Sequence, residues 1–161
     1  MTDDEVTLHM VCGKIASGKT TLSAELVSRP GTVLIAEDDW LAALFGDELV
    51  SGADYVRCSA RLRNVMGPLV ISLLQAGVSV VLDFPANTIE VRNWMREIFT
   101  NANASHQLHF LDVSEEICLK RLRERNASGE HAFAPNERQF RRFSKHFTAP
   151  LQEEGFNVVK H

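Results

Sequence analysis

A glycine-rich segment near the start of the chain has the residue types that bind a phosphate group. In VCGKIASGKTTL, residues 11–22, Gly13, Gly18, Lys19 and Thr20 match the spacing G-x-x-x-x-G-K-[ST]. Glycines let consecutive backbone N–H groups point at one phosphate, the lysine reaches the β and γ phosphates, and the threonine hydroxyl can hold Mg²⁺. The pattern predicts a site for ATP and Mg²⁺. Its expected lining residues are Gly13, Lys14, Ile15, Ala16, Ser17, Gly18, Lys19, Thr20 and Thr21.

A carboxylate follows a second apolar run. Asp83 comes directly after Val80, Val81 and Leu82, and a magnesium site beside a phosphate-binding loop needs a carboxylate of this kind at the end of a neighbouring strand. We expect Asp83 to hold the metal, or one of its waters, together with Thr20. The alternative is an acidic turn residue at the end of a buried strand. Asn87, four residues further on, is a weaker candidate for the same pocket.

These residues must be positioned by the elements around them, and apolar runs alternate with helical patterns along the whole chain. Strands separated by helices favour right-handed crossovers and a mostly parallel sheet with helices on both faces, with ligands at the carboxyl ends of the strands. The expected strands are Val6–Cys12, Thr32–Ala36, Val78–Asp83, His106–Val113 and Phe156–Lys160. The clearest helical stripe is Tyr55, Cys58, Leu62, Val65, Met66, Leu69 and Leu73. The polar segment Arg125–Glu137, which includes His131, is expected to be a mobile surface loop.

Length and composition bound the class of protein. The 161 residues, 45% of them hydrophobic, suit a single domain over residues 1–161. A net charge of −4 provides no overall field for a polyanion or an acidic membrane, and no apolar run is long enough for a membrane span. Cys12, Cys58 and Cys118 are expected to be buried, reduced thiols. We expect a cytoplasmic monomer or homodimer without a membrane partner, and nucleic acid is disfavoured as a partner.

The phosphate-binding loop, Asp83 and the later CLKRLRERN together resemble the kinase-like branch of P-loop proteins. That branch includes gluconate and shikimate kinases, chloramphenicol phosphotransferase, zeta toxins and small ATP-binding proteins often labelled AAA-family ATPases. The last group is the most similar, through EDDWLAALFGD, VVLDFPAN, RLRERN and FTAPLQEEGFNVV. The resemblance implies an α/β, three-layer P-loop NTPase fold with a mostly parallel five-stranded sheet and a small helical lid near residues 121–137.

The resemblance also implies catalytic roles. In this branch an acidic residue just after the second strand accepts the proton of the substrate hydroxyl, and Asp38 matches that position, with Asp39 expected as a helix cap. The alternative is that the whole EDD segment is an N-cap with favourable acids in the first helical turn. Relatives carry lid arginines that fold over the triphosphate, which implies this role for Arg121 and Arg125. The expected catalytic residues are Asp38, Lys19 and Arg125. For Arg123 a solvated helix face is preferred.

The leading functional hypothesis is a Mg-ATP-dependent phosphotransferase acting on a hydroxyl of a small soluble metabolite or antibiotic-like compound. Its acceptor contacts are expected in Leu41–Gln75, where Arg57 and Arg61 share one helix face. The alternatives are a nucleotide-binding switch or ATPase with little transfer activity, and a polynucleotide 5′-kinase. The acidic charge balance ranks the polynucleotide kinase third.

Overall fold

The computed structural model describes residues 5–129 and 135–161. Its centre is one sheet in the order β2-β3-β1-β4-β5, in which every neighbouring pair runs parallel. The strands are β1 Thr7–Cys12, β2 Thr32–Ala36, β3 Ser79–Pro85, β4 Ser105–Phe110 and β5 Val158–Lys160. The predicted five-stranded parallel sheet is confirmed. Because β3 extends two residues beyond Asp83, that carboxylate lies within the strand and not after it.

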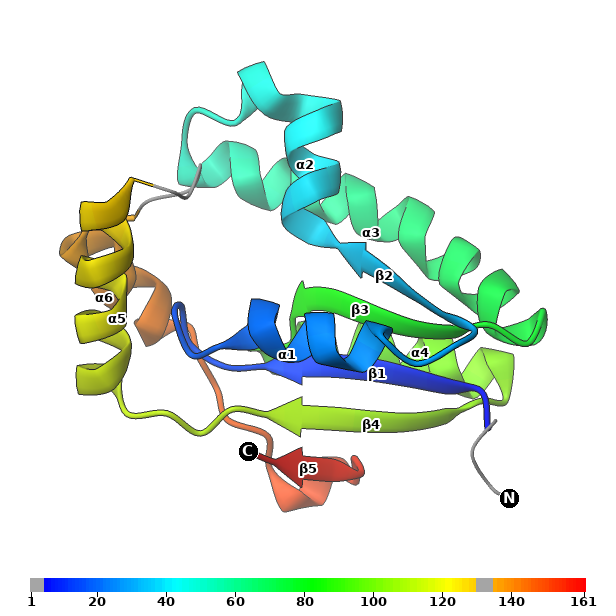
Figure 1. Cartoon of the computed structure of the whole chain (residues 1–161). Helices are drawn as coiled ribbons and strands as arrows, with labels where there is room; N and C mark the ends of the chain where they lie inside the picture. Colours follow the sequence, from blue (N-terminus) through cyan, green and yellow to red (C-terminus); the bar gives the residue numbers. More distant parts are fainter. Residues whose placement is uncertain (1–4, 130–134) are drawn as a thin grey trace.

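Helices pack on both faces of the sheet and beyond one end of it. They are α1 Lys19–Val27, α2 Glu37–Phe45, α3 Gly52–Gln75, α4 Ile89–Ala102, α5 Glu115–Ser128 and α6 Glu137–Lys145, with short 3₁₀ turns η1 Gly46–Glu48 and η2 Gln152–Glu154. In Figure 1, α1 lies in front of the sheet, α4 lies behind it, and α5 and α6 stand beyond the carboxyl ends of the strands. The three-layer α/β architecture is therefore confirmed.

The two central strands explain why the sheet is a firm base for a site. The side chains of β1 from Leu8 to Cys12 are buried, and so are Val80, Val81 and Leu82 of β3, as expected for parallel strands covered on both faces. The central strand β1 leads directly into the glycine-rich segment. Residues that follow β3 and β4 then flank that segment, because the Ala86 N–H donates to the Val11 carbonyl and the Leu111 N–H to the Cys12 carbonyl.

Local signals set the ends of the helices. Ser51 and Asp54 form a capping box at the start of α3, and the side chains of Thr88, Ser114 and Asn136 cap α4, α5 and α6. The predicted apolar stripe of α3 was partly wrong as a prediction of its buried face, because Val65 is 62% exposed and Leu69 is 38% exposed. The buried face follows rows four residues apart instead. It contains Cys58, Ser59, Leu62, Met66, Gly67, Val70 and Leu74.

The expected loop over Arg125–Glu137 was also partly wrong. Helix α5 continues through Arg125 to Ser128 and ends at Gly129, whose φ of 69° suits glycine. The helix persists because Arg125 and Asn126 are half-buried, and the Asn126 side chain donates to the Pro135 carbonyl at 2.8 Å. His131 lies outside the described residues. The three cysteines are buried and unpaired, as expected. Within the described ranges, no helix has the length and apolar character needed to cross a membrane.

Candidate active site

The shape of the glycine-rich loop depends on its glycines. A Cβ atom on Gly13 would lie 2.4 Å from Ser17 Oγ, so the first glycine is required by close packing. Ala16 and Gly18 have φ angles of 64° and 104°, which turn successive backbone N–H groups to the same side. Gly18 is the N-cap of α1 and supplies no side-chain cap. The N-terminal end of α1 is therefore available to an anion.

Lys19 lies folded onto this loop. Its Nζ donates to the Gly13 carbonyl at 2.6 Å and to the Lys14 carbonyl at 2.8 Å. Burial lowers the pKa of Lys19, and the nearby carboxylates of Asp83 and Asp38 oppose that shift. The Ser17 hydroxyl is buried and has no hydrogen-bond partner among the described residues. A cation and an unpaired hydroxyl within a cradle of backbone N–H groups fit the phosphates of a nucleotide.

Asp83 lies next to this lysine. The β2–β3 register pairs Asp83 with Ala36, the residue immediately before α2. Burial raises the pKa of Asp83, Lys19 lowers it, and the carboxylates of Asp38 and Asp39 raise it further. The three acids and the lysine predicted from the sequence are therefore close enough to influence one another's charge.

Thr20 is the second residue of α1, and its side chain is exposed. One hydroxyl and one carboxylate suit Mg²⁺, which keeps several waters and takes further oxygens from phosphates. No group of three or more His, Cys, Asp or Glu side chains in the described ranges forms a protein-only metal cage. Thr20 and Asp83 are accordingly the residues that could hold the metal beside a bound nucleotide.

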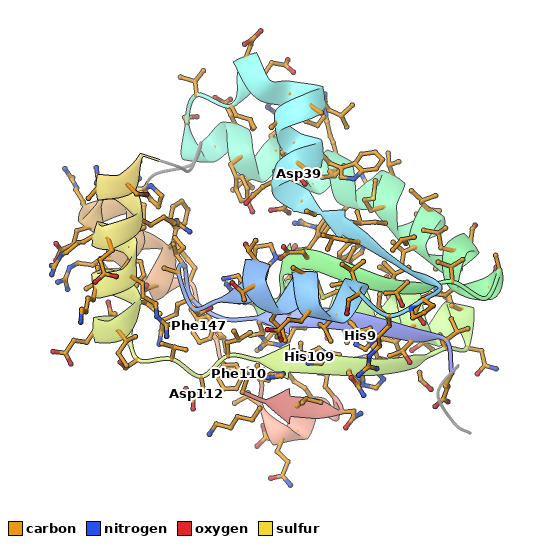
Figure 2. The ribbon with its side chains drawn as sticks, viewed as in Figure 1. His9, Asp39, His109, Phe110, Asp112 and Phe147 are labelled. Carbon is orange, nitrogen blue, oxygen red and sulfur yellow. The ribbon has the colours of Figure 1, made fainter. Side chains whose placement is uncertain are left out.

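Asp38 and Asp39 lie in the first turn of α2. The helix begins at Glu37 and its N-cap is Ala36, so the prediction that Asp39 caps the helix was wrong. The cause is the direct passage from β2 into α2 without an intervening turn. Desolvation by the surrounding protein raises the pKa of Asp38 although its side chain is exposed, and Asp39 raises it further. Figure 2 shows Asp39 on α2, beyond the carboxyl end of β2.

Glu37 was missed by the sequence reading. It is only 3% exposed, and it accepts hydrogen bonds from the Tyr55 hydroxyl and, at 2.9 Å, from the Ser59 hydroxyl. Arg63 donates to the Ser59 hydroxyl at 3.2 Å. Burial raises the pKa of Glu37, whereas its two hydrogen bonds lower it. Tyr55, Ser59 and Arg63 are spaced four residues apart and so lie on one face of α3. This spacing could have identified the polar row, which connects the start of α2 to α3.

The arginines of α3 are arranged differently from the sequence expectation. Arg57 forms an ion pair with Asp54 at 3.3 Å on the surface, and Arg61 is exposed. Arg63 instead lies half-buried next to the Glu37 network. Among these three arginines, Arg63 is therefore the one that lies beside the Glu37 network.

Helix α5 brings the two predicted lid arginines to the site. Arg121 approaches the Ser17 carbonyl at 3.4 Å. The Arg125 Nε atom is buried without a hydrogen-bond partner among the described residues, and its charge lowers the pKa of Asp38. Arg123 is 65% exposed and pairs with Glu137, as the sequence predicted for a solvated position. The loop lysine, the proposed base and the lid arginine therefore converge from three separate elements.

A hollow of about 440 Å³ opens beside the loop. Its lining combines the loop and α1 with helix α5 and the residues that follow β4 and β5. The lining residues are Ala16, Gly18, Thr21, Leu22, Glu25, Leu111, Arg121 and His161. The hollow is large enough for one small organic group next to the phosphate cradle.

A chain of three histidines reaches this hollow from inside the sheet, and sequence reading missed it. His9 Nδ1 lies 3.1 Å from His109 Nε2, and His109 Nδ1 lies 2.9 Å from His161 Nε2. His9 and His109 occupy the neighbouring strands β1 and β4 (Figure 2). Burial lowers the pKa of His9, and burial with the adjacent histidines lowers that of His109 to about 4. The inner two rings are therefore neutral near pH 7.

A fully buried arginine organises the turn after β3. Arg92 is 0% exposed and forms a two-point ion pair with Glu154, with Nε–Oε1 at 2.8 Å and Nη2–Oε2 at 3.1 Å. Its Nη1 also donates to the carbonyls of Ala86 at 2.9 Å and Thr148 at 2.7 Å. Nearby, Lys14 Nζ lies 5.3 Å from the ring centre of Phe147, which Figure 2 labels. The segment after α6 is thus fastened beside the phosphate-binding loop.

Comparisons with known proteins agree with this geometry. A family model described as an AAA domain matches residues 8–150, and no curated protein matches the chain. A candidate kinase from Chloroflexus aurantiacus has a TM-score of 0.73 at 20% identity, with 100% of this chain and 86% of that chain covered. The APS kinase CysC of Mycobacterium tuberculosis, in complex with AMPPNP and APS, has a TM-score of 0.54 at 21% identity, with 80% and 77% covered.

A chain of the Pnkp1/Rnl/Hen1 complex has a TM-score of 0.62 at 22% identity. The match covers 85% of this chain and 43% of that chain. Likenesses at these identities show a shared fold, here the kinase-like P-loop fold. The AAA-domain match extends over most of the sequence and includes the loop, the acids of α2, Asp83 and helix α5. The chain therefore belongs to the AAA domain family, within the kinase-like branch of P-loop proteins.

Proposed function

We propose that the protein transfers the γ-phosphoryl group of Mg-ATP to a hydroxyl group of a small soluble metabolite or antibiotic-like compound. The observation that carries this proposal is the convergence of Lys19, Asp38, Asp83 and Arg125, whose charges influence one another at the carboxyl end of the sheet. A cation at the loop, two carboxylates and a lid arginine are the parts that phosphoryl transfer needs.

The nucleotide would lie with its phosphates in the loop and its nucleoside in the neighbouring hollow. Lys19 would then leave the Gly13 and Lys14 carbonyls for the β and γ phosphates, and Arg121 would lie beside the nucleoside or the α phosphate. Bound Mg²⁺ would supply charge neutralisation for the β and γ oxygens. Thr20 and Asp83 would hold it.

The acceptor hydroxyl would lie near Asp38. A carboxylate within hydrogen-bond reach orients the hydroxyl and accepts its proton while the new P–O bond forms. The buried Glu37, held by Tyr55 and Ser59, fixes the first turn of α2 and so the position of Asp38. Arg125 would stabilise charge on the transferring phosphoryl group.

The polarity around α2 and α3 supports a polar acceptor. Arg63 and the Glu37 network provide charged and hydrogen-bonding groups on the side of α3 that faces α2. The net charge of −4 argues against a polyanionic acceptor. The three buried, unpaired thiols fit a cytoplasmic setting, and we propose a monomer or homodimer.

The first test is nucleotide binding by calorimetry with Mg-ATP. Lys19→Ala should abolish tight binding and leave the melting temperature close to that of the wild type, because the hydrogen bonds of Lys19 in the described structure go to loop carbonyls that keep a second donor. Lys120→Ala, at an exposed position of α5, is the matched control and should bind as the wild type does. Equal ATP affinity in Lys19→Ala and the wild type would overturn the proposal.

The second test identifies the acceptor. The pure protein is incubated with γ-labelled ATP and a panel of sugars, nucleosides, amino-alcohols and aminoglycosides, and label transfer is measured. Transfer to one of these is the expected result. ATP binding without transfer to any compound would support the switch or ATPase alternative.

A polynucleotide 5′-kinase is the second candidate, and the observation that favours it is the fold shared with a chain of an RNA repair complex. Labelling of RNA 5′ ends that falls steeply with added salt would favour it over a small acceptor.

A further inference from the structure

Asn87 contacts both backbone groups of Gly13, the first glycine of the phosphate-binding loop. The Gly13 N–H donates to Asn87 Oδ1 at 3.0 Å, and Asn87 Nδ2 donates to the Gly13 carbonyl at 2.9 Å. A backbone N–H can only donate and a carbonyl can only accept, so these two contacts fix the orientation of the carboxamide. The Asn87 side chain therefore forms hydrogen bonds with the N–H and the carbonyl of Gly13, as the backbone of a neighbouring strand would. The two residues are 74 positions apart in the sequence.

The Gly13 carbonyl is shared between two donors. Besides Asn87 Nδ2 it accepts from Lys19 Nζ, and Lys19 also occupies the Lys14 carbonyl. A lysine that moves to a phosphate must give up both contacts. A buried carbonyl left without a donor costs free energy, and Gly13 is buried.

Each of these carbonyls retains a second donor when Lys19 leaves. The Gly13 carbonyl keeps Asn87 Nδ2, and the Lys14 carbonyl keeps the Ser17 N–H at 3.1 Å. Both carbonyls therefore stay hydrogen-bonded with or without the lysine. Lys19 can exchange its protein partners for a phosphate without exposing an unpaired carbonyl.

Asn87 is itself held from both sides. Its carbonyl accepts from the Thr148 N–H at 2.8 Å, and the Ala86 N–H before it donates to the Val11 carbonyl at 3.0 Å. Arg92 Nη1 binds the carbonyls of both Ala86 and Thr148. The backbone on which Asn87 stands is thus fixed independently of any ligand.

We propose that Asn87 is a positioning residue for nucleotide binding: its carboxamide holds Gly13 in place and keeps the Gly13 carbonyl paired when Lys19 moves to the phosphates. The inference rests on the proposed function only in that ATP is taken as the ligand. It differs from the role of a metal or water ligand that the sequence suggested for this residue. Asn87 acts through Gly13 and Lys19.

The test compares nucleotide affinities of Asn87 variants by calorimetry or competition, with Mg-ATP and AMP as probes. Asn87→Ala removes both contacts, and Asn87→Asp keeps an acceptor for the Gly13 N–H but loses the donor to the carbonyl. Both variants should weaken ATP binding by about tenfold or more and AMP binding by less than about threefold, since only the β and γ phosphates draw Lys19 away. Asn93→Ala, at an exposed position of α4, is the control and should match the wild type.

Equal losses for ATP and AMP in Asn87→Ala would overturn the proposal, since a general distortion of the loop would affect both. Unchanged ATP affinity in either variant would overturn it as well. If the variants fail to fold, amide hydrogen exchange of the wild-type protein decides instead. Asn87 should keep the Gly13 N–H protected both without nucleotide and with ATP bound, and a loss of protection on ATP binding would contradict the role.

The outcome is separable from that of the proposed function because the measured quantity is binding. A wild-type protein that binds ATP but phosphorylates no acceptor would count against the phosphotransferase and leave the Asn87 test intact. A wild-type protein that does not bind ATP would overturn both.

Discussion

Asp38 and Asp39 are adjacent carboxylates in the first turn of α2, and the charge of Asp39 affects the pKa of Asp38. Desolvation and the Asp39 charge raise the pKa of Asp38, whereas Lys19 and Arg125 lower it. A general base must be deprotonated before it can accept a proton, so a raised pKa moves the acid limit of activity upward from the usual range of an aspartate. If Asp38 is the general base, as we propose, the charge of Asp39 therefore sets part of the pH dependence of activity.

We expect Asp38→Asn to reduce phosphoryl transfer by roughly a hundredfold or more while ATP affinity stays near the wild-type value, within the usual range for loss of a general base. Asp39→Asn should reduce transfer much less. Removal of the Asp39 charge lowers the pKa of Asp38, so the acidic limb of the kcat/KM profile should move to lower pH. Steady-state kinetics between pH 4 and pH 8 measure both effects. A larger loss in Asp39→Asn would assign the base to Asp39, and equal activity in both variants would support a switch.

At the scale of elements, helix α5, the proposed lid, carries two arginines that reach different parts of the candidate site. Arg121 and Arg125 lie four residues apart in one row of the helix, so one reaches the loop at Ser17 and the other lies in the field of Asp38. Glu137 of α6 pairs with Arg123 on the outer face of the same helix. Exposed pairs of this kind contribute little to stability.

Arg125→Ala should lower turnover far more than it weakens ATP binding, because an interaction with the transferring phosphoryl group strengthens only in the transition state. By analogy with arginine fingers, the loss in kcat could reach about a thousandfold. Arg123→Ala removes an arginine from the exposed face of the same helix and is the matched control. Single-turnover rates and ATP dissociation constants separate the two effects. Equal losses of affinity and rate would assign Arg125 to ground-state binding.

The sequence predicted the features that depend on the spacing of nearby residues, such as the strands and the phosphate-binding loop. The loop from Gly13 to Thr20 is recognisable because its requirements for glycine, lysine and hydroxyl fall within eight positions. Asn87 and Arg92 could not be assigned their roles, because their partners Gly13 and Glu154 lie 74 and 62 residues away. Arg92 sits in an amphipathic helix where an arginine ordinarily faces solvent. Only the packed fold shows that it points inward.

At the scale of the whole molecule, the histidine chain places titratable groups inside the sheet. His9 and His109 are each 3% exposed, and the pKa of each is below the ordinary value for histidine, with desolvation as the main cause and the Arg29 charge as a further one. The folded protein therefore binds fewer protons at His109 than the unfolded chain does between about pH 4 and pH 6.5, and the shift at His9 has the same sign. Their contribution to stability is present above that window and is lost as the pH falls through it.

We expect the free energy of unfolding to fall on acidification from pH 7 to pH 4.5, with a slope of up to about 1.4 kcal/mol per pH unit from each histidine. Asp38, Asp83 and Glu37, whose pKa values are raised, act in the opposite direction, so the diagnostic quantity is a difference between variants. His109→Asn should flatten the pH dependence of stability. His146→Asn, at an exposed position, should not. Urea unfolding at several pH values measures the slopes, and identical slopes in His109→Asn and the wild type would contradict this assignment.

The buried pair between Arg92 and Glu154 has a consequence for how the protein matures on the ribosome. A chain synthesised from its N-terminus presents the phosphate-binding loop first and the segment from Thr148 to Glu154 much later. Until that segment emerges, the Arg92 charge has no carboxylate partner and resists burial, so the backbone around Asn87 is not yet fixed. The nascent chain can therefore form its central strands early, but the backbone around Asn87 is fixed beside the loop only after Glu154 has emerged.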